Sequence, residues 1–508
     1  MAWALASFLV ALLFAQAVGQ IFGLRRRNRQ QRAKLLSALG VEDVSKKKII
    51  GFFHPYCNAG GGGERVLWAA ISALQRKEPN IISVVYSGDI DATKEKIIDK
   101  VKARFDIELS PRTLHFVFLK SRHLVEDSTW PRFTLLGQSL GSMYLVWEAM
   151  TYLIPDLFID TMGYAFTFPV VSLLGNVPIG AYVHYPTIST TMLSRVKSRT
   201  RGHTNSEAIS SSALLSQGKL LYYRVFMYYY AYSLRQAHFL MVNSSWTKNH
   251  IDSILQHQDT LLDLIHYLPP LVLLKLLSRS RLRSPKSAQI VYPSCDTRQL
   301  AEFPLEGRER VILSIAQFRP EKDHAAQLHA FHKFLEMYPE YRGSGPSAVK
   351  LVLMGGSRNV GDATRLENLR LLARELQIKD QVEFIPNAPY SAILNWLSRA
   401  SIGLSTMVDE HFGINIVEFM AAGVIPVAHA SGGPLLDIIV PLNGEPTGYH
   451  ATSPETFAEA FRTVFTLPRE AELAMRQRAR TLAVQKFSAE EFEKGWDASG
   501  WRDLLFRQ

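Results

Sequence analysis

Short apolar segments alternate with longer helical stretches along nearly the whole chain, in two successive series. Buried strands of parallel sheets read as short apolar runs, and a helix usually returns the chain between them. The sequence therefore predicts an α/β fold with two doubly wound, nucleotide-fold domains that face a cleft. The predicted strands are 47–53, 81–86, 114–118, 157–159, 179–183 and 239–242 in the first series, and 311–315, 351–354, 382–385, 402–404 and 424–427 in the second.

The chain has 508 residues, which is too long for one ordinary core and fits two domains with extensions. Pro293, Pro304 and Gly307 indicate a linker between the two series. The predicted division is a transmembrane anchor at 1–24, a basic stalk at 25–46, a first domain at 47–300, a second domain at 301–487 and a crossover helix at 488–508.

Charge and cysteine content exclude several classes of protein. The net charge is +11, but nine basic residues lie between Arg25 and Lys48 against only two acidic ones. A nucleic-acid-binding protein would spread its basic residues through the folded part, so no nucleic acid partner is expected. Cys57 and Cys295 are the only cysteines and neither lies in a CxxC motif, which excludes a disulfide framework or zinc site and favours a reducing compartment.

Residues 2–24 carry no charged side chain and are rich in Ala, Leu, Val and Phe. As a helix they would extend about 34 Å, which is enough to cross a bilayer. A cleaved signal peptide is the alternative, but its positive charge should precede the apolar run, whereas here the charge follows it. The positive-inside rule then predicts a retained anchor with everything after Leu24 in the cytosol.

Two further segments combine apolar, aromatic and basic residues. Residues 220–232 are rich in tyrosine, and residues 261–283 mix Leu, Ile and Val with Lys and Arg. Both compositions suit a membrane interface. An ordinary core helix for the first and a surface insertion for the second explain the sequence equally well, so both alternatives stay open.

A glycine-rich loop follows the first predicted strand. Gly60, Gly61, Gly62 and Gly63 precede a helix that is predicted to begin at Glu64. Glycines let backbone amides approach a phosphate or sugar without a side chain in the way. The loop matches neither the Walker motif nor the dinucleotide fingerprint, and a tight connection remains an alternative.

Two cations end the first strand of the second series. Arg319 and Lys322 are predicted to lie near the carboxyl edge of the sheet, where a helix begins. Cations at a helix amino terminus oppose its dipole unless an anion joins them, so this pair suggests a diphosphate site. Departure of a nucleoside diphosphate creates charge that such a pair can stabilise.

Two carboxylates, Glu410 and Glu418, stand eight positions apart around a helix predicted to begin at Gly413. Glu410 is expected in the preceding loop, and Glu418 a turn or more into the helix. A carboxylate accepts two hydrogen bonds in fixed geometry, which suits sugar hydroxyls. From the sequence alone, Glu418 is equally well explained as a solvated helix residue.

These elements resemble a known enzyme family. The R-x-x-K element at 319–322 followed by the E-x7-E element at 410–418 is similar to the retaining GT-B glycosyltransferases that use nucleotide sugars. The segments His54–Trp68 and Tyr182–Thr187, with the amino-terminal anchor, resemble the dolichol-pathway α-1,2-mannosyltransferases. The resemblance spans nearly all of residues 48–508.

The resemblance implies roles for individual residues. It places Arg319 and Lys322 on the donor diphosphate, Glu418 on the ribose hydroxyls and Glu410 near the donor mannose. His184 is expected beside the reaction centre, although a histidine after an apolar strand is as often a core residue. The remaining expected donor-binding positions are Gly61, Gly62, Gly63, Gly355, Phe412, Gly413 and Ile414, with Gly356, Gly432, Gly433 and Pro434 nearby.

The resemblance also implies an activity and a location. The first domain would bind the acceptor and the second the nucleotide sugar, and the last helix would cross back to the first domain, as in other transferases of this kind. Mannose would pass from GDP-mannose to dolichol-diphosphate-linked Man3GlcNAc2 and then Man4GlcNAc2, with retention and without a cofactor. No Asp-x-Asp element lies near the proposed diphosphate site, so no metal is expected. The expected location is the endoplasmic reticulum membrane, single-pass and facing the cytosol, with other mannosyltransferases of the pathway as partners.

Three other functions are compatible with parts of this pattern. One is a mannosyltransferase of the same pathway that forms α-1,3 or α-1,6 linkages. Another is a catalytically silent membrane scaffold, which would have no reason to keep Arg319, Lys322, Glu410 and Glu418 together. The last is a sugar-nucleotide epimerase, which would not need an anchor.

Overall fold

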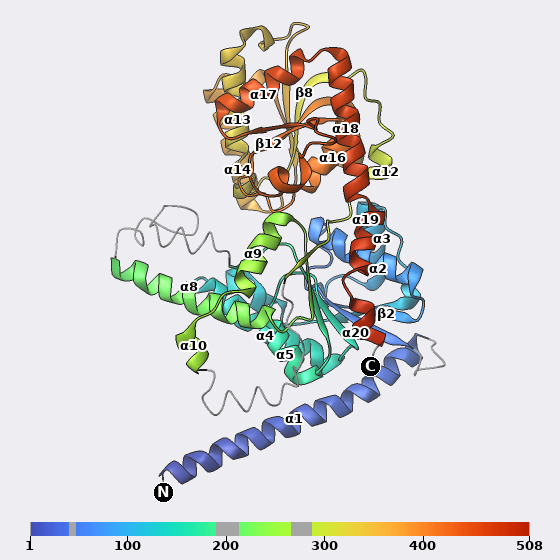
Figure 1. The fold of residues 1–508 in the computed structure, drawn as a ribbon, viewed down its shortest axis with the longest axis vertical. Coiled ribbons are helices and arrows are strands. Elements are labelled where there is room, and N and C mark those ends of the chain that lie inside the picture. The colour runs from blue at the N-terminus through green and yellow to red at the C-terminus, as the bar shows by residue number, and fades with distance from the viewer. Residues whose placement is uncertain (1, 40–46, 189–212, 266–286, 507–508) are drawn as a thin grey trace. The chain divides into compact units, whose positions relative to one another are not determined.

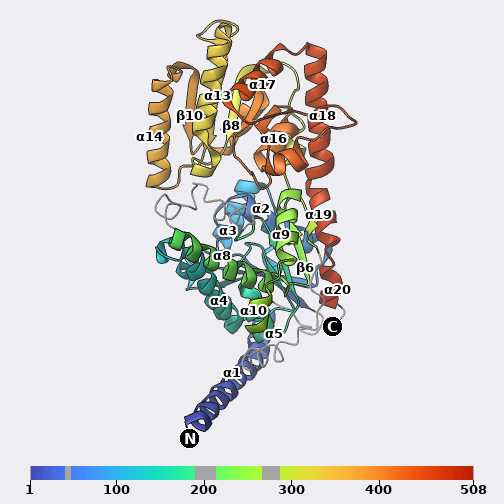
Figure 2. The same ribbon diagram turned by 60° about the vertical axis from the view of Figure 1, so that its left-hand side comes forward.

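The computed structural model of the chain describes residues 2–39, 47–188, 213–265 and 287–506 (Figures 1 and 2). Two units emerge from the contacts between residues, and each is described by itself. Unit 1 comprises Met1–Val242, Thr247–Ile290 and Trp496–Gln508, and unit 2 comprises Asn243–Trp246 and Val291–Gly495. The predicted boundary between residues 300 and 301 therefore falls inside unit 2.

In its described part, unit 1 is built on a seven-stranded parallel sheet with the order β3-β2-β1-β4-β5-β6-β7. The strands are β1 (Lys48–Phe53), β2 (Ile81–Ser87), β3 (Leu114–Phe118), β4 (Leu157–Asp160), β5 (Ile179–Val183), β6 (Phe239–Val242) and β7 (Gln289–Ile290). Its α-helices are α1 (Ala2–Ala38), α2 (Gly62–Lys77), α3 (Lys94–Phe105), α4 (Thr134–Tyr152), α5 (Thr167–Gly175), α8 (Ala213–Leu234), α9 (Ser245–Leu255), α10 (Thr260–Ile265) and α20 (Trp501–Phe506). The first two residues of α9 are assigned to unit 2.

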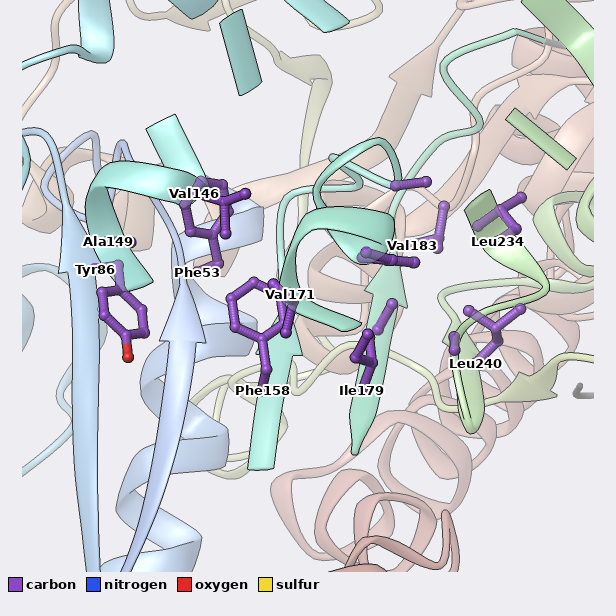
Figure 3. Close-up of a cluster of buried hydrophobic side chains, with 14 of the residues drawn as sticks. Phe53, Tyr86, Val146, Ala149, Phe158, Val171, Ile179, Val183, Leu234 and Leu240 are labelled. Carbon is purple, nitrogen blue, oxygen red and sulfur yellow. The ribbon is translucent and has the colours of Figure 1, made fainter. Parts of the chain in front are cut away.

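The core of unit 1 lies between one face of this sheet and helices α4, α5 and α8. Phe53, Tyr86 and Phe158 on neighbouring strands point toward Val146 of α4 and Val171 of α5 (Figure 3). All five side chains are fully buried. This packing holds strands β1, β2 and β4 in place. The carboxyl ends of β1 and β4 lead into candidate site residues.

Unit 2 contains a six-stranded parallel sheet, within the described residues, with the order β10-β9-β8-β11-β12-β13. The strands are β8 (Glu309–Ile315), β9 (Lys350–Gly355), β10 (Val382–Pro386), β11 (Ala400–Ser405), β12 (Ile425–His429) and β13 (Tyr449–Ala451). Its α-helices are α12 (Thr297–Leu300), α13 (His324–Met337), α14 (Val360–Glu375), α15 (Tyr390–Arg399), α16 (Ile414–Ala422), α17 (Pro454–Thr466), α18 (Arg469–Phe487) and α19 (Ala489–Asp497), the last of which ends in unit 1.

Both faces of the unit 2 sheet are covered. Ile312 of β8 packs in a cluster with α13, α14 and α17, whereas Val311 and Leu313 pack in a second cluster with α16 and α18. Successive residues of a strand point to opposite faces, so a continuous apolar run is needed when helices cover both. The prediction of two parallel α/β domains is confirmed.

Each sheet has a point where the strand order changes direction, between β1 and β4 in unit 1 and between β8 and β11 in unit 2. The loops that leave the carboxyl ends of these neighbouring strands diverge to opposite faces of the sheet. Ligands of open α/β sheets bind in the crevice that this divergence leaves. The residues after β1, β4, β8 and β11 are therefore expected to form the ligand-binding sites.

The segment predicted as a stalk is helical up to Ala38 and docks on unit 1. Arg25 donates to the carbonyls of Leu174 and Leu173 at the end of α5, at 2.9 and 3.1 Å, and Arg32 forms a 2.8 Å ion pair with Asp156. A cation is favourable at a helix carboxyl terminus, where the last carbonyls lack helical partners. The basic residues therefore tie α1 to the body of the unit.

The predicted anchor forms the first part of α1, but the side chains of residues 2–15, 17 and 18 lie outside the described part of the chain. Among the residues that are described, no helix has the length and apolar character needed to cross a membrane. Residues 266–286, which include most of the predicted interface segment 261–283, also lie outside the described residues.

The tyrosine-rich segment 220–232 is part of α8 and belongs mostly to the core. Phe226, Met227 and Tyr230 are buried in the main cluster of unit 1, whereas Leu221 is exposed. The core alternative thus accounts for most of this segment. At the carboxyl terminus the chain returns to unit 1, where buried Trp496 stacks on Phe52 at 6.4 Å between ring centroids.

Candidate active site

The glycine-rich loop of unit 1 joins β1 to α2 and is held by side chains on several sides. The backbone N–H of Asn58 donates to Asp89 at 3.0 Å, Lys100 donates to the Asn58 carbonyl at 2.6 Å and the Gly61 N–H donates to the Glu64 carboxylate. Gly60 has a φ of 83°, a conformation that strongly favours glycine. Gly62 and Gly63 begin α2, and first-turn amides of a helix can bind an anion.

His184 follows β5 and lies next to this loop. Its Nε2 is 3.2 Å from the Thr161 carbonyl oxygen, and its ring lies 4.9 Å from that of Tyr182. A β-carbon on Gly63 would be 3.5 Å from Nε2. The structure therefore brings His184 and the glycine loop, which the sequence predicted separately, to one edge of the sheet.

The sequence analysis did not assign roles to His54 and Thr161, which also lie at this edge of the sheet. Buried His54 follows β1 and contacts both Thr161, after β4, and Glu64 of α2. Their signal in the sequence is their place directly after apolar strands, at the change of strand order.

Asp160, the last residue of β4, is a fully buried carboxyl beside this cluster. It accepts hydrogen bonds from the N–H groups of Met162 and Gly163, both at 3.0 Å. Burial raises the pKa of Asp160 to about 7, although these hydrogen bonds lower it in part. The carboxyl therefore titrates near neutral pH.

The melting temperature should depend on pH because of the raised pKa of Asp160. The folded carboxyl keeps its proton up to about pH 7, while the unfolded chain releases it near its ordinary value of 3.8. Stability should therefore decrease as the pH rises across this window, by up to about 4 kcal/mol, and level off above it. Asp160→Asn has no carboxyl to ionise at this position. The difference in melting temperature by which wild type exceeds this variant should therefore shrink between pH 5 and pH 8. Parallel curves for the two proteins would contradict this.

In unit 2, the ends of β8 and β11 bring together a cation and a carboxylate. Lys322 Nζ lies 2.5 Å from Glu410 Oε2, and both side chains are largely buried. Thr406, which follows β11, donates to the Asp323 carbonyl at 2.9 Å and so joins the two loops. Arg319 begins the same turn as Lys322, is partly exposed and lies 3.6 Å from Glu321.

Gly355 and Gly356 lie beside the loop that leads from β8 to Arg319 and Lys322. Gly355 ends β9, and a β-carbon there would lie 1.7 Å from the Ala316 carbonyl oxygen. The backbones are joined by hydrogen bonds from the Ala316 N–H to Met354 at 2.8 Å and from the Phe318 N–H to Gly356 at 3.0 Å. Gly355 therefore permits the close approach that positions the loop of Arg319 and Lys322.

Gly432 and Gly433 pack against the loop that carries Glu410. Gly433 donates its N–H to the Glu410 carbonyl at 2.7 Å, and a β-carbon on Gly432 would lie 2.2 Å from the same oxygen. Gly413, with a φ of 114°, caps α16 on the other side of the loop. Pro434 follows as the first residue of a short π-helix. These glycines let three backbone segments meet around Glu410.

The remaining predicted donor-binding residues differ in burial and therefore in which of their atoms can reach a ligand. The ring of Phe412 is buried against Tyr292 and Phe487, at 5.9 and 5.5 Å between centroids, so only its backbone can reach a ligand. Ile414 is half-buried at the start of α16 and packs on the same core. Glu418 is half-buried one turn further along this helix.

The two groups of residues belong to different units. The glycine-rich loop and His184 lie in unit 1, and Lys322, Arg319, Glu410 and Glu418 lie in unit 2. In unit 2, cations and carboxylates together provide ligands for a phosphate and for sugar hydroxyls. Among the described residues, no group of three or more His, Cys, Asp and Glu side chains is arranged to hold a metal ion.

Two family models match the two units. Residues 47–255 match the model described as the ALG11 mannosyltransferase N-terminus. Residues 296–482 match the model described as glycosyl transferases group 1.

Similar solved structures support the fold. The α,α-trehalose 6-phosphate synthase of Burkholderia multivorans superposes with a TM-score of 0.62 and 12% identity, covering 91% of this chain and 100% of that one. HepE of Anabaena, in complex with UDP and glucose, superposes with a TM-score of 0.56 and 14% identity over 90% of this chain and 100% of that one. At such identities the likeness shows the two-domain glycosyltransferase fold alone.

Curated relatives match over most of the sequence. The human protein named GDP-Man:Man(3)GlcNAc(2)-PP-Dol alpha-1,2-mannosyltransferase is 44% identical over 91% of this chain and 88% of its own length. The Dictyostelium discoideum protein of the same name is 45% identical over 89% of this chain and 84% of its own length. The chain therefore belongs to the family of GDP-Man:Man(3)GlcNAc(2)-PP-Dol alpha-1,2-mannosyltransferases.

Proposed function

We propose that this chain transfers mannose from GDP-mannose in α-1,2 linkage to dolichol-diphosphate-linked Man3GlcNAc2 and then to Man4GlcNAc2. The observation that carries the proposal is the identity of 44 to 46% with enzymes of this name over about nine tenths of the chain. Lys322 and Glu410 lie where the strand order of unit 2 changes, which is where open α/β sheets bind their ligands.

The proposed roles follow the chemistry of each group. Lys322 and Arg319 neutralise the diphosphate as the bond between it and the anomeric carbon breaks, and Glu410 accepts hydrogen bonds from the donor mannose. Glu418 binds the ribose hydroxyls, and His184 lies beside the reacting sugar. The acceptor hydroxyl attacks the face from which GDP departs, and its proton passes to a phosphate oxygen of the leaving GDP, which gives retention.

We propose that this chemistry needs no metal ion. The support is the cation content of the donor site, because Lys322 and Arg319 can together balance the charge that develops on the diphosphate. Transfer should then continue in excess EDTA at the rate measured without it. Loss of transfer in EDTA and its return with Mg²⁺ or Mn²⁺ would overturn this part of the proposal.

The activity is tested with radiolabelled GDP-mannose and a lipid-linked trimannosyl acceptor. The expected products carry one and then two additional mannoses, both released by a mannosidase specific for α-1,2 linkages. Resistance to that enzyme and release by an α-1,3 or α-1,6 mannosidase would assign the chain to the other transferases of the pathway. A folded protein that neither transfers mannose nor hydrolyses GDP-mannose would be a silent scaffold.

We also propose that the chain is anchored by residues 2–24 in the endoplasmic reticulum membrane, single-pass, with both units in the cytosol. Helix α4 of unit 1 supports membrane contact. Large apolar side chains recur on its surface at helical spacing and are 43 to 54% exposed, namely Leu136, Leu140, Tyr144 and Trp147. Exposed apolar surface with aromatic residues suits a lipid interface.

The position of α1 also supports membrane contact through the exposed apolar side chains of α4. Gln31 of α1 donates to the Thr151 carbonyl of α4 at 3.1 Å, so the helix that carries the proposed anchor is tied to the helix that carries the apolar stripe. A bilayer that holds the anchor would thus lie near the stripe.

A polarity-sensitive dye can test this contact in the full chain. The native Cys57 and Cys295 are both buried, so a dye can be attached selectively to an introduced surface cysteine. A dye attached at Leu140→Cys should emit at a shorter wavelength when the labelled protein is reconstituted in vesicles than when the same labelled protein is in detergent-free buffer. The matched control is Leu371→Cys, at an equally exposed leucine of α14 in unit 2. Identical emission from both positions would remove the proposed membrane face.

A further inference from the structure

A closed ring of contacts surrounds the end of β1 in unit 1. Its centre is His54, whose side chain is fully buried. His54 Nδ1 lies 2.8 Å from Thr161 Oγ1, and Nε2 lies 3.5 Å from Glu64 Oε1. The other oxygen of Glu64 accepts the N–H of Gly61, and the Thr161 carbonyl oxygen lies 3.2 Å from His184 Nε2. His184 also lies beside the loop, because a β-carbon on Gly63 would be 3.5 Å from its Nε2, and this proximity completes the ring.

The chemistry of these contacts sets the hydrogen positions. Carboxylate and carbonyl oxygens only accept hydrogen bonds, so Nε2 of His54 carries a proton toward Glu64 and Nε2 of His184 carries one toward Thr161. Although burial raises the pKa of Glu64, the hydrogen bond and charge of His54 and the backbone bond of Gly61 bring it below its ordinary value. Glu64 is therefore the charged acceptor that ties His54 to the loop.

A glycine-rich loop does not hold one conformation by itself. Each glycine has access to backbone conformations that other residues avoid, so fixing the loop requires outside contacts. Glu64 supplies such a contact at Gly61, and Thr161 supplies one at His184. His54 links the two anchors across 107 residues of sequence.

We propose that His54, Glu64 and Thr161 are positioning residues that fix the glycine-rich loop and the His184 ring in a single arrangement for sugar transfer. This inference rests on the function proposed above, because it assigns work to the loop and to His184. None of the three residues needs to touch a substrate. They act by keeping the reacting groups within the narrow geometry that transfer requires.

The decisive variants change hydrogen bonding while keeping shape. In Glu64→Gln, one of the two accepting oxygens becomes an NH2 group, which only donates, so the Gly61 and His54 contacts can no longer each have an oxygen of their own. In Thr161→Val, the hydroxyl that contacts His54 is lost. Per folded molecule, kcat should fall about tenfold or more in each, with a KM for GDP-mannose near that of wild type, because a small misplacement reduces rate steeply. Thr161→Ser keeps the hydroxyl and should retain most of the wild-type kcat.

The matched control is another buried carboxylate of unit 1. Glu148 of α4 accepts the N–H groups of Lys120 and Ser121, at 2.9 and 3.1 Å, and has no part in the ring. Glu148→Gln should lose stability as Glu64→Gln does while keeping the wild-type kcat per folded molecule. Equal losses of kcat in both variants, or a wild-type kcat in Thr161→Val, would overturn the proposal.

Hydrogen–deuterium exchange tests the ring without reference to activity. The amides of residues 58–63 should exchange faster in Glu64→Gln and at the wild-type rate in Glu148→Gln. Unchanged exchange of this loop in Glu64→Gln would refute the positioning role even in an active enzyme. A wild-type protein without transferase activity would instead refute the proposed function, and the exchange data would still decide whether the ring holds the loop.

Discussion

Replacing Lys322 with alanine is expected to lower kcat for mannosyl transfer by about a hundredfold to a thousandfold, the loss typical when a group that stabilises developing charge is removed. The ammonium group of Lys322 lies at the change of strand order in unit 2, where the departing diphosphate needs a cation. Its removal also leaves the Glu410 carboxylate buried beside an anionic donor without this partner. The measurement is steady-state transfer from GDP-mannose at saturating acceptor.

Two comparisons make the Lys322 experiment specific. Lys333→Ala removes a lysine of the same unit that forms an ordinary 3.0 Å surface pair with Glu336, and it should leave kcat unchanged. In the double variant Lys322→Ala with Glu410→Gln, the loss should be smaller than the product of the two single losses, because contacting residues couple. A kcat for Lys322→Ala close to that of wild type would remove the leaving-group role.

Gly355→Ala is expected to destabilise unit 2 by about 3 kcal/mol and to lower donor binding, because a single methyl group is forced into a closely packed backbone. The added β-carbon would lie 1.7 Å from the Ala316 carbonyl oxygen and 3.2 Å from Gln317 Cα. Neither atom is at the end of a flexible side chain, so the strand ends must separate. Thermal unfolding and titration with GDP would record both effects.

The neighbouring glycine provides the matched control. A β-carbon on Gly356 would have its nearest neighbour, the Gln317 side chain, 3.8 Å away, which is an ordinary contact. Gly356→Ala should therefore unfold within about 0.5 kcal/mol of wild type. If Gly355→Ala unfolded at the same temperature as Gly356→Ala, the close approach of β8 and β9 would not be the reason for glycine at position 355.

The strands were the most predictable part of the fold. Predicted strands at 114–118, 179–183 and 239–242 have the bounds that the structure gives to β3, β5 and β6. β5 and β6 lie inside the sheet, where a continuous apolar run is required. β3 lies at an edge of the sheet but still buries Leu114, Phe116 and Val117. The prediction did not include β7 or β13, which have only two and three residues, too few to form a recognisable apolar run.

The candidate site was predictable in its residue types and less so in its geometry. Lys322 stood out because it follows an apolar strand where a helix begins, and Glu410 because of its spacing to Glu418 around the start of another helix. The sequence did not show that the two side chains meet, because 88 residues separate them. Phe412 was expected at the donor, whereas its ring is buried in the core, because a helix-start motif does not reveal which side chains turn inward. The role of His54 rests on partners 10 and 107 residues away.

The sequence by itself determined the alternation of strands and helices, the family of the chain and the positions of its polar strand ends, because these depend on local composition and on motifs that are continuous in the chain. The tertiary structure alone decided which strand ends are neighbours. Pairing of β8 with β11 brings Lys322 to Glu410, and pairing of β1 with β4 brings His54 to Thr161. The physical reason is that strand order is selected by the burial of whole sheet faces, a sum over many distant side chains that no single segment contains.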